Sequence, residues 1–273
     1  MRFDAYNATV REAEFPLVIS VLESGLQGHS KEAKARGRLE QVVNIDVDNR
    51  TACSVGVDRA SRCVFVEGKG HTSPRLAKLL RVHFPGHGVA RADVCEDFSE
   101  PKAFERLQSI IRRVKEPRVH AAYVMLSDDP TDGRTWQCGK PSGVVLSRLY
   151  EKGKQPGFIG VVDPDLVRLE FQVRPQYSAG KLAAAAMEPP ELIGFARWAT
   201  VVAKAVLELD IPRVESEVRV HSLDKTATYI GRAFRRTLEE LHADGVDVMR
   251  EWQDLWAEDD RLKSLHATRG SAR

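Results

Sequence analysis

A tyrosine flanked by basic residues stands in the segment 144–152, which reads VVLSRLYEK. If this segment forms a β-strand, Arg148, Tyr150 and Lys152 point to one face, because side chains alternate along a strand. A phenol has an ordinary pKa of about 10, so it attacks phosphorus only where positive charge stabilises the phenolate. The segment therefore predicts a nucleophilic tyrosine between two cations. A half-exposed strand end with solvated charges is the alternative interpretation.

Two further segments place an arginine two residues before a carboxylate. Arg91 precedes Asp93, and Arg168 precedes Glu170, in stretches whose alternation also indicates strands. If these strands are neighbours of the tyrosine strand in one sheet, both carboxylates converge beside Tyr150. Two carboxylates together with phosphate oxygens form a typical Mg²⁺ or Mn²⁺ site, in which the metal polarises a phosphodiester. Ordinary arginine–carboxylate pairs on the wet face of an antiparallel sheet are the alternative.

The order of strand-like and helix-like segments indicates an α+β fold. We expect an antiparallel sheet core, for which two ferredoxin-like halves are one arrangement, followed by a C-terminal helical region. Residues 1–178 would form the core, 179–265 the helical region packed on it, and 266–273 a disordered tail, while the charged segment 30–38 is expected to be a loop. The expected strands are 41–48, 51–58, 63–67, 89–98, 119–126, 134–138, 144–152 and 166–173, and the expected helices are 15–28, a short helix from 73, 99–114, 189–209, 224–242 and 246–265.

The composition is that of a globular protein that buries a core. Hydrophobic residues make up 42% and charged residues 29% of the chain, which excludes a disordered protein. No apolar run approaches the roughly 18 residues of a membrane span, and the N-terminus lacks the features of a signal peptide. The 4 cysteines lack metal-binding spacing and are expected to be reduced thiols. We therefore expect a cytoplasmic protein with no membrane partner.

The charge distribution and one glycine-containing segment bear on the class of enzyme. Residues 101–182, which include Tyr150, hold 14 lysines and arginines against 9 aspartates and glutamates. This basic excess is compatible with a phosphate-binding face. The segment 133–141 is close to a nucleotide-binding loop, but it has 5 residues between its glycines where that loop has about four, and proline follows its lysine. The sequence thus excludes an ATPase of that type.

Five short motifs occur in order along the chain. They are Val-Ala-Arg-Ala-Asp-Val at 89–94, Trp-Gln-Cys-Gly-Lys-Pro-Ser at 136–142, Tyr-Glu-Lys-Gly at 150–153, Val-Arg-Leu-Glu at 167–170 and Gly-Phe-Ala-Arg-Trp at 194–198. This series resembles the replication initiation factor family of rolling-circle plasmids and filamentous phages, to which nicking relaxases of conjugative elements are related. The resemblance covers residues from about 42 to 246. The histidine–hydrophobe–histidine motif of other rolling-circle initiators is absent, and Lys140-Pro141 stands where smaller or hydroxylated residues are expected.

The resemblance implies a metal-dependent DNA nicking and joining enzyme that acts at a replication origin. Tyr150 would attack one strand and keep the 5′-phosphate as a covalent ester, with Arg148 and Lys152 as catalytic cations. The freed 3′-hydroxyl would prime synthesis, and a second transesterification would close the circle. A non-catalytic DNA-binding or regulatory protein on the same fold is the alternative.

The resemblance also implies the ligands and partners of such an enzyme. Asp93 and Glu170 would bind Mg²⁺ or Mn²⁺, and Asp97 or Glu151 are alternatives to Asp93. The substrate would be single-stranded or supercoiled origin DNA, and unwinding would fall to a separate helicase. A single candidate tyrosine for two transesterifications suggests a homodimer, and the alternatives are reuse of the tyrosine or a water-assisted final step. The arginines expected to bind DNA are Arg91, Arg168 and Arg174.

Overall fold

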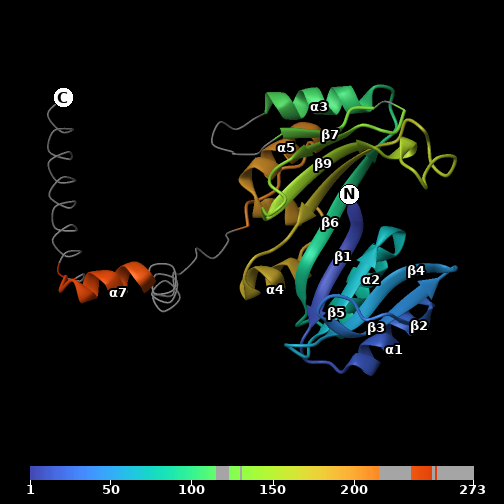
Figure 1. Ribbon diagram of the computed structural model, residues 1–273. Helices are drawn as coiled ribbons and strands as arrows, with labels where there is room; N and C mark the ends of the chain where they lie inside the picture. The colour runs from blue at the N-terminus through green and yellow to red at the C-terminus, as the bar shows by residue number, and fades with distance from the viewer. Residues whose placement is uncertain (115–122, 130, 215–234, 248–249, 251–273) are drawn as a thin grey trace, which may run out of the picture. The chain divides into compact units, whose positions relative to one another are not determined.

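The computed structural model describes residues 1–114, 123–129, 131–214, 235–247 and 250 (Figure 1). The chain divides into two compact units, Met1–Glu217 and Val218–Arg273. The second unit contains the described helix α7 (Arg235–Ala243), which overlaps the predicted helix 224–242. The predicted helix 246–265 and the tail lie almost entirely outside the described residues, so the extent of the C-terminal helical region stays a prediction.

The first unit is built on a 10-stranded antiparallel sheet with the order β2-β3-β4-β5-β1-β6-β10-β9-β8-β7 (Figure 1). Helices accompany this sheet, so the predicted α+β class is confirmed. The strands are β1 (Arg2–Val10), β2 (His29–Ala33), β3 (Leu39–Val47), β4 (Arg50–Asp58), β5 (Val64–Lys69), β6 (Gly88–Phe98), β7 (Tyr123–Ser127), β8 (Thr135–Cys138), β9 (Val145–Glu151) and β10 (Val167–Val173). The helices are α1 (Phe15–Leu26), α2 (Ser73–His83), α3 (Ala103–Arg113), α4 (Ser178–Ala186) and α5 (Arg197–Leu207), with short 3₁₀ turns η1 (Gly70–Thr72), η2 (Lys152–Lys154) and η3 (Glu191–Phe195).

The two halves of the sheet have the same strand order when each is counted from its outer edge to the centre. The elements β1, α1, β2, β3, β4, β5 and α2 have counterparts, in the same chain order, in β6, α3, β7, β8, β9, β10 and α4. The strands β1 and β6 pair with each other at the centre, so each half begins at the middle of the sheet and ends beside its own first strand. The expected two halves are therefore present, although each contains five strands where a ferredoxin-like half would have four.

Several elements differ from the sequence-based expectations. The predicted helix 189–209 is divided into η3 and α5, and α4 lies outside the expected helices. The strand β1 was missed, although it lies at the centre of the sheet and pairs with both β5 and β6. Its alanines and asparagine have low strand propensity, and two register irregularities break the alternation. The strand β2 was expected to be a loop because it is charged. It is an edge strand paired with β3, where exposed charges discourage pairing with other chains.

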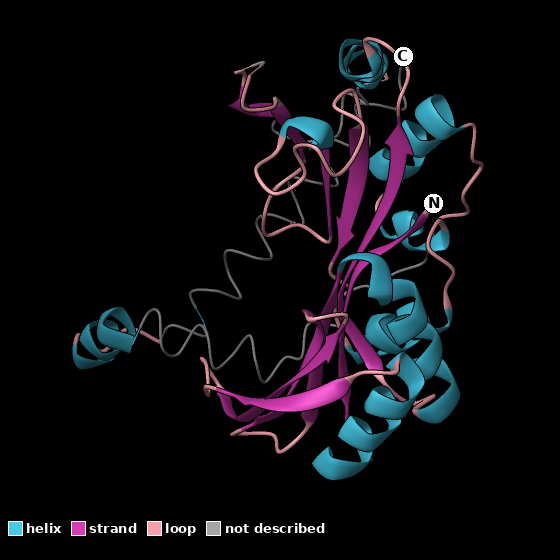
Figure 2. Ribbon diagram, turned by 90° about the vertical axis from the view of Figure 1, so that its right-hand side faces the viewer, coloured by secondary structure: helices cyan, strands magenta, loops and turns pink. Residues whose placement is uncertain are grey.

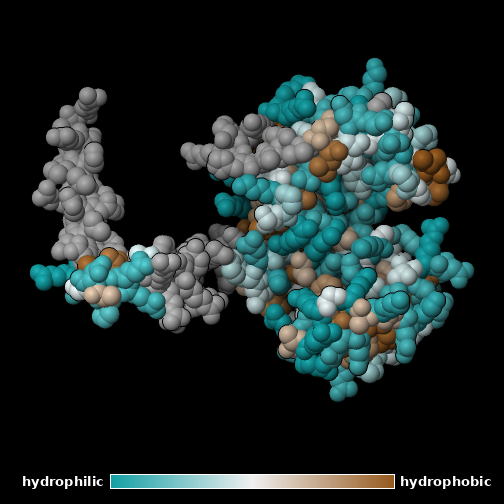
Figure 3. Space-filling model, viewed as in Figure 1, coloured by the Kyte–Doolittle hydropathy of each residue, from teal (hydrophilic) through white to brown (hydrophobic). Residues whose placement is uncertain are grey.

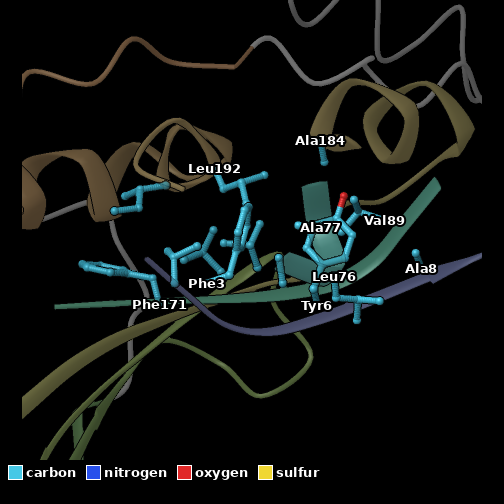
Figure 4. Close-up of a cluster of buried hydrophobic side chains, with 14 of the residues drawn as sticks. Phe3, Tyr6, Ala8, Leu76, Ala77, Val89, Phe171, Ala184 and Leu192 are labelled. Atoms are coloured by element: carbon cyan, nitrogen blue, oxygen red, sulfur yellow. The ribbon is translucent and has the colours of Figure 1, made fainter. Parts of the chain in front are cut away.

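The helices of the first unit cover one face of the sheet (Figure 2). Side chains on that face form the hydrophobic core, in which Phe3 and Tyr6 come from β1 and Phe171 comes from β10 (Figure 4). The Tyr6 hydroxyl lies 2.7 Å from Nε2 of His87, whose Nδ1 lies 2.8 Å from the Phe84 carbonyl oxygen. His87 therefore lies in the loop between α2 and β6, and its ring is buried against the core. With the core on one face, the opposite face of the sheet is left for polar side chains.

Two smaller expectations concern cysteines and the membrane. All four cysteines are free thiols, and Cys53, Cys95 and Cys138 lie in strands, as predicted. None of the helices within the described residues is both long and apolar enough to span a membrane.

Candidate functional site

Strands β6, β10 and β9 are direct neighbours, as the convergence of the predicted site residues requires. In this register Glu170 stands opposite Arg148 on β9, and Arg168 stands opposite Tyr150. On the other side of β10, Gln172 stands opposite Asp93 on β6. Paired residues of antiparallel strands share a face, so the structure brings these polar side chains together on the face away from the helices.

The Tyr150 hydroxyl contacts a carboxylate. It donates a hydrogen bond of 3.1 Å to Oε2 of Glu170, and the two residues are only 8% and 4% exposed. Burial, followed by the negative charge of Glu170, raises the pKa of Tyr150. The sequence suggested a phenolate between two cations. The structure instead contains a neutral phenol whose hydroxyl donates its hydrogen bond to a carboxylate, Glu170, that can act as a base.

Glu170 and Asp93 are each paired with an arginine. Arg148 forms an ion pair with Glu170, Arg91 forms one with Asp93, and the Gln172 amide lies 3.5 Å from Asp93. Burial and the charge of Asp93 raise the pKa of Glu170, although Arg148 lowers it. The two carboxylates are therefore close enough to repel each other electrostatically.

That repulsion is the observation relevant to a metal ion, because a cation between the carboxylates would relieve it. The described residues contain no group of three or more histidine, cysteine, aspartate or glutamate side chains arranged to hold a metal. Magnesium is often bound through only one or two carboxylates together with substrate phosphates and water. Asp93 and Glu170 fit that mode, with the metal replacing arginine contacts.

Arg168 lies at the centre of a buried ion-pair network. It is 3% exposed and donates to both oxygens of Asp97 at 2.6 and 2.8 Å. Its Nη1 lies 2.6 Å from Oδ1 of Asp4, but the angle is too poor for a hydrogen bond. Arg2 binds Asp97 at 2.5 Å. This network orders the strand position opposite Tyr150, and the expected contact of Arg168 with DNA stays a prediction.

Lys152 lies just beyond the end of the strand. It begins η2 and is 8% exposed, and its Nζ lies 4.5 Å from the centroid of the Phe158 ring. Burial, followed by the nearby charge of Arg168, lowers the pKa of Lys152. This ammonium is thus held close to the tyrosine site in an environment that favours loss of its proton.

Arginine side chains form the more exposed rim of the site. The side chains of Arg91 and Arg148 are 31% and 32% exposed. Arg174 donates to the Pro141 carbonyl oxygen at 2.7 Å, and burial and the charges of Arg91 and Arg148 lower its pKa. In addition, Nε of Arg148 has no hydrogen-bond partner. The positive charges of Arg91 and Arg148 near Arg174 favour binding of an anion such as phosphate.

Glu151 lies on the sheet face opposite to Tyr150, and its contacts join two neighbouring strands. Its carboxylate accepts hydrogen bonds from the Arg134 backbone N–H at 2.9 Å, from the Arg134 side chain at 2.8 and 3.0 Å and from Lys154 at 2.9 Å. These contacts fasten the end of β9 to the start of β8. The sequence offered Glu151 as an alternative metal ligand and gave no sign of this network, because Arg134 is distant along the chain.

The Glu151 network predicts a pH-dependent loss of stability in the variant Glu151→Gln. Burial opposes ionisation of Glu151, but hydrogen bonds from Arg134 and Lys154 outweigh it and lower its pKa to about 2. A lowered pKa contributes stability above the ordinary value of about 4.3, and that stability is lost as the pH falls towards 2. We expect the variant to lose about 1–3 kcal/mol at pH 7, measured by urea unfolding, and the difference to shrink between about pH 4 and pH 2. A constant difference over this range would contradict the ion pair.

Comparisons with known proteins bear on the fold. No family model matches the chain, and no curated protein matches it in sequence. Among solved structures, a rolling circle replication initiator protein from Geobacillus stearothermophilus aligns with a TM-score of 0.52 and 17% identity, over 78% of this chain and 98% of that chain. At this identity the comparison concerns the backbone, so the chain shares the fold of a rolling-circle replication initiator.

Proposed function

We propose that this chain initiates rolling-circle replication by nicking and rejoining one DNA strand through Tyr150. The observation that carries the proposal is the 3.1 Å hydrogen bond from the buried phenol to Glu170, beside an arginine rim. The same fold occurs in a replication initiator. The substrate would be supercoiled or single-stranded origin DNA in the cytoplasm, and a separate helicase would unwind the duplex.

Each side chain has a role in a balanced transesterification. A bond forms from the Tyr150 oxygen to phosphorus as the bond from phosphorus to the 3′ oxygen breaks. The phenolic proton passes to Glu170, which is already its hydrogen-bond acceptor. The departing 3′ oxygen takes a proton from Lys152, whose lowered pKa favours donation. Reversal of these steps on a second 3′-hydroxyl rejoins the strand.

The remaining residues of the site act on the phosphate and on the geometry. Arg148 and Arg91 would bind the non-bridging phosphate oxygens from the rim. Asp93 and Glu170 would hold Mg²⁺ or Mn²⁺, which would supply Lewis-acid stabilisation of charge at the phosphate. Arg168, fixed by Asp97 and Asp4, would keep the strand opposite Tyr150 in register.

A non-catalytic DNA-binding protein is the second candidate. The observation that favours it is that Tyr150 is largely buried and that each site carboxylate is neutralised by an arginine. Such a cluster can serve stability alone. The two candidates differ in whether DNA becomes covalently attached to the protein.

The test is identification of a tyrosine–DNA adduct. Protein would be incubated with Mn²⁺ and supercoiled DNA that carries its coding sequence and flanks, then digested with trypsin and nuclease and examined by mass spectrometry. We expect a nucleotide-modified peptide that contains Tyr150, formed with Mn²⁺ and lost with a chelator. DNA binding without any adduct or nick, under either metal, would favour the non-catalytic candidate.

A further inference from the structure

The connection between β9 and β10 carries an exposed hydrophobic tip next to the proposed site. Ile159 and Val161 are 68% and 67% exposed, among the most exposed large hydrophobic residues of the described chain. The loop projects at the upper right of Figure 1, and hydrophobic atoms stand at the same place in Figure 3. Single exposed apolar residues are ordinary on protein surfaces. Two of them on one projecting tip form a small apolar surface whose exposure to water is unfavourable in free energy.

Comparison of the two halves shows that this loop is an addition. The counterpart connection, between β4 and β5, comprises only residues 59–63, where Asp58 accepts hydrogen bonds from the Ala60 and Ser61 backbone. The connection between β9 and β10 runs from 152 to 166. The longer, apolar connection therefore occurs in the half that contains Tyr150 and not in its counterpart.

The loop is a series of tight turns. Backbone hydrogen bonds run from Gln155 to Lys152, from Phe158 to Gln155, from Val161 to Phe158 and from Leu166 to Asp163, all between 2.9 and 3.2 Å. The two ends of the loop pack closely against each other, because a Cβ on Gly153 would lie only 2.1 Å from the Asp163 carbonyl oxygen. The apolar tip is thus presented on an ordered support, and little entropy is lost when it binds.

The support joins the tip to the proposed site. Phe158, next to Ile159, lies under the ammonium of Lys152. Lys152 directly follows the strand that bears Tyr150, and the arginine rim lies on the same sheet face. DNA whose phosphate reaches Tyr150 would therefore pass close to the tip. Apolar side chains that meet DNA bases insert between base steps and unstack them.

Resting on the proposed function, we propose that Ile159 and Val161 form a wedge that binds unstacked bases of the DNA beside the nicked phosphate. The wedge would separate the strands locally and deliver a single strand to Tyr150. Its occupant is the apolar face of nucleobases, and the adjacent cations hold the phosphates that flank them.

The test compares single-stranded and duplex substrates with the double variant Ile159→Ser/Val161→Ser. The variant should nick a single-stranded oligonucleotide that spans the mapped site at a rate within about twofold of wild type, since no unstacking is needed. Nicking of the same sequence as a relaxed duplex should fall by about tenfold or more. Val82→Ser is the matched control, because Val82 is 65% exposed on α2, in the other half; it should nick both substrates at the wild-type rate.

A binding measurement separates failure of the wedge from failure of the proposed function. A duplex with 2-aminopurine in the protein's footprint should brighten when wild-type protein binds it and should not brighten with the double variant. Equal nicking of both substrates by the variant, or equal loss on both, overturns the wedge. If wild-type protein increases the fluorescence of the probe but never nicks DNA, the nicking function is overturned while the wedge is supported. A variant that changes the oligomeric state instead would assign the tip to contact between copies of the chain and overturn the proposal.

Discussion

The variant Tyr150→Phe is expected to reduce the rate of nicking by more than about 10³-fold, because it removes the atom that bonds to phosphorus. The measurement is single-turnover nicking of supercoiled DNA with Mn²⁺ present. Affinity for the DNA should change by less than about threefold, since the phenol is 8% exposed and the arginine rim remains. Loss of the hydrogen bond to Glu170 should cost about 1 kcal/mol of stability, too little to unfold the protein.

Tyr177→Phe is the matched control for this experiment. Tyr177 is 41% exposed and precedes α4, outside the cluster around Glu170. It should nick at the wild-type rate. A wild-type rate of nicking by the Tyr150→Phe variant would show that Tyr150 is not the nucleophile and that another residue is.

The two halves differ at the strand position that Tyr150 occupies. If β4 and β5 are placed on β9 and β10 by their registers, Ser54 and Glu67 correspond to Arg148 and Glu170, and Gly56 corresponds to Tyr150. A Cβ on Gly56 would lie 2.9 Å from Cδ1 of Leu39 and 3.0 Å from the Gln41 carbonyl oxygen, so a side chain at this position is crowded. The first half thus keeps a carboxylate without the nucleophile. The position that corresponds to Tyr150 in the first half therefore supplies no second nucleophile.

The sequence predicted the three strands, but not their pairing or the contacts between them. Alternation places Tyr150, Asp93 and Glu170 on polar faces, because side-chain direction follows from the strand itself. The partner of each charge depends on register, which only the assembled sheet defines. For this reason the approach of the carboxylates to Tyr150 was expected only on the condition that the strands are neighbours, and the Arg168 network was not foreseen. Asp4 was missed with them, because the strand that carries it has no clear alternating pattern.

Glu170→Gln is expected to lower the nicking rate by about 10²–10⁴-fold, the range for loss of a general base. The amide can keep a hydrogen bond with Tyr150 or Arg148, so the site should stay folded, but it cannot take the phenolic proton. Glu67→Gln is the control, because Glu67 occupies the corresponding position in the first half and pairs with Arg36 at 2.8 Å. That control should nick at the wild-type rate.

Titration with Mn²⁺ decides which role of Glu170 dominates. If Glu170 mainly accepts the proton, saturating Mn²⁺ leaves the rate of Glu170→Gln low, while Mn²⁺ binding measured by electron paramagnetic resonance persists through Asp93. If Glu170 mainly holds the cation, Mn²⁺ binding weakens and a higher Mn²⁺ concentration restores part of the rate, because mass action fills the weakened site. The hydrogen bond from the phenol and the raised pKa of Glu170 favour the first result. A wild-type rate at low Mn²⁺ would exclude both roles, since a residue that neither takes the proton nor holds the metal has no part in breaking the phosphodiester.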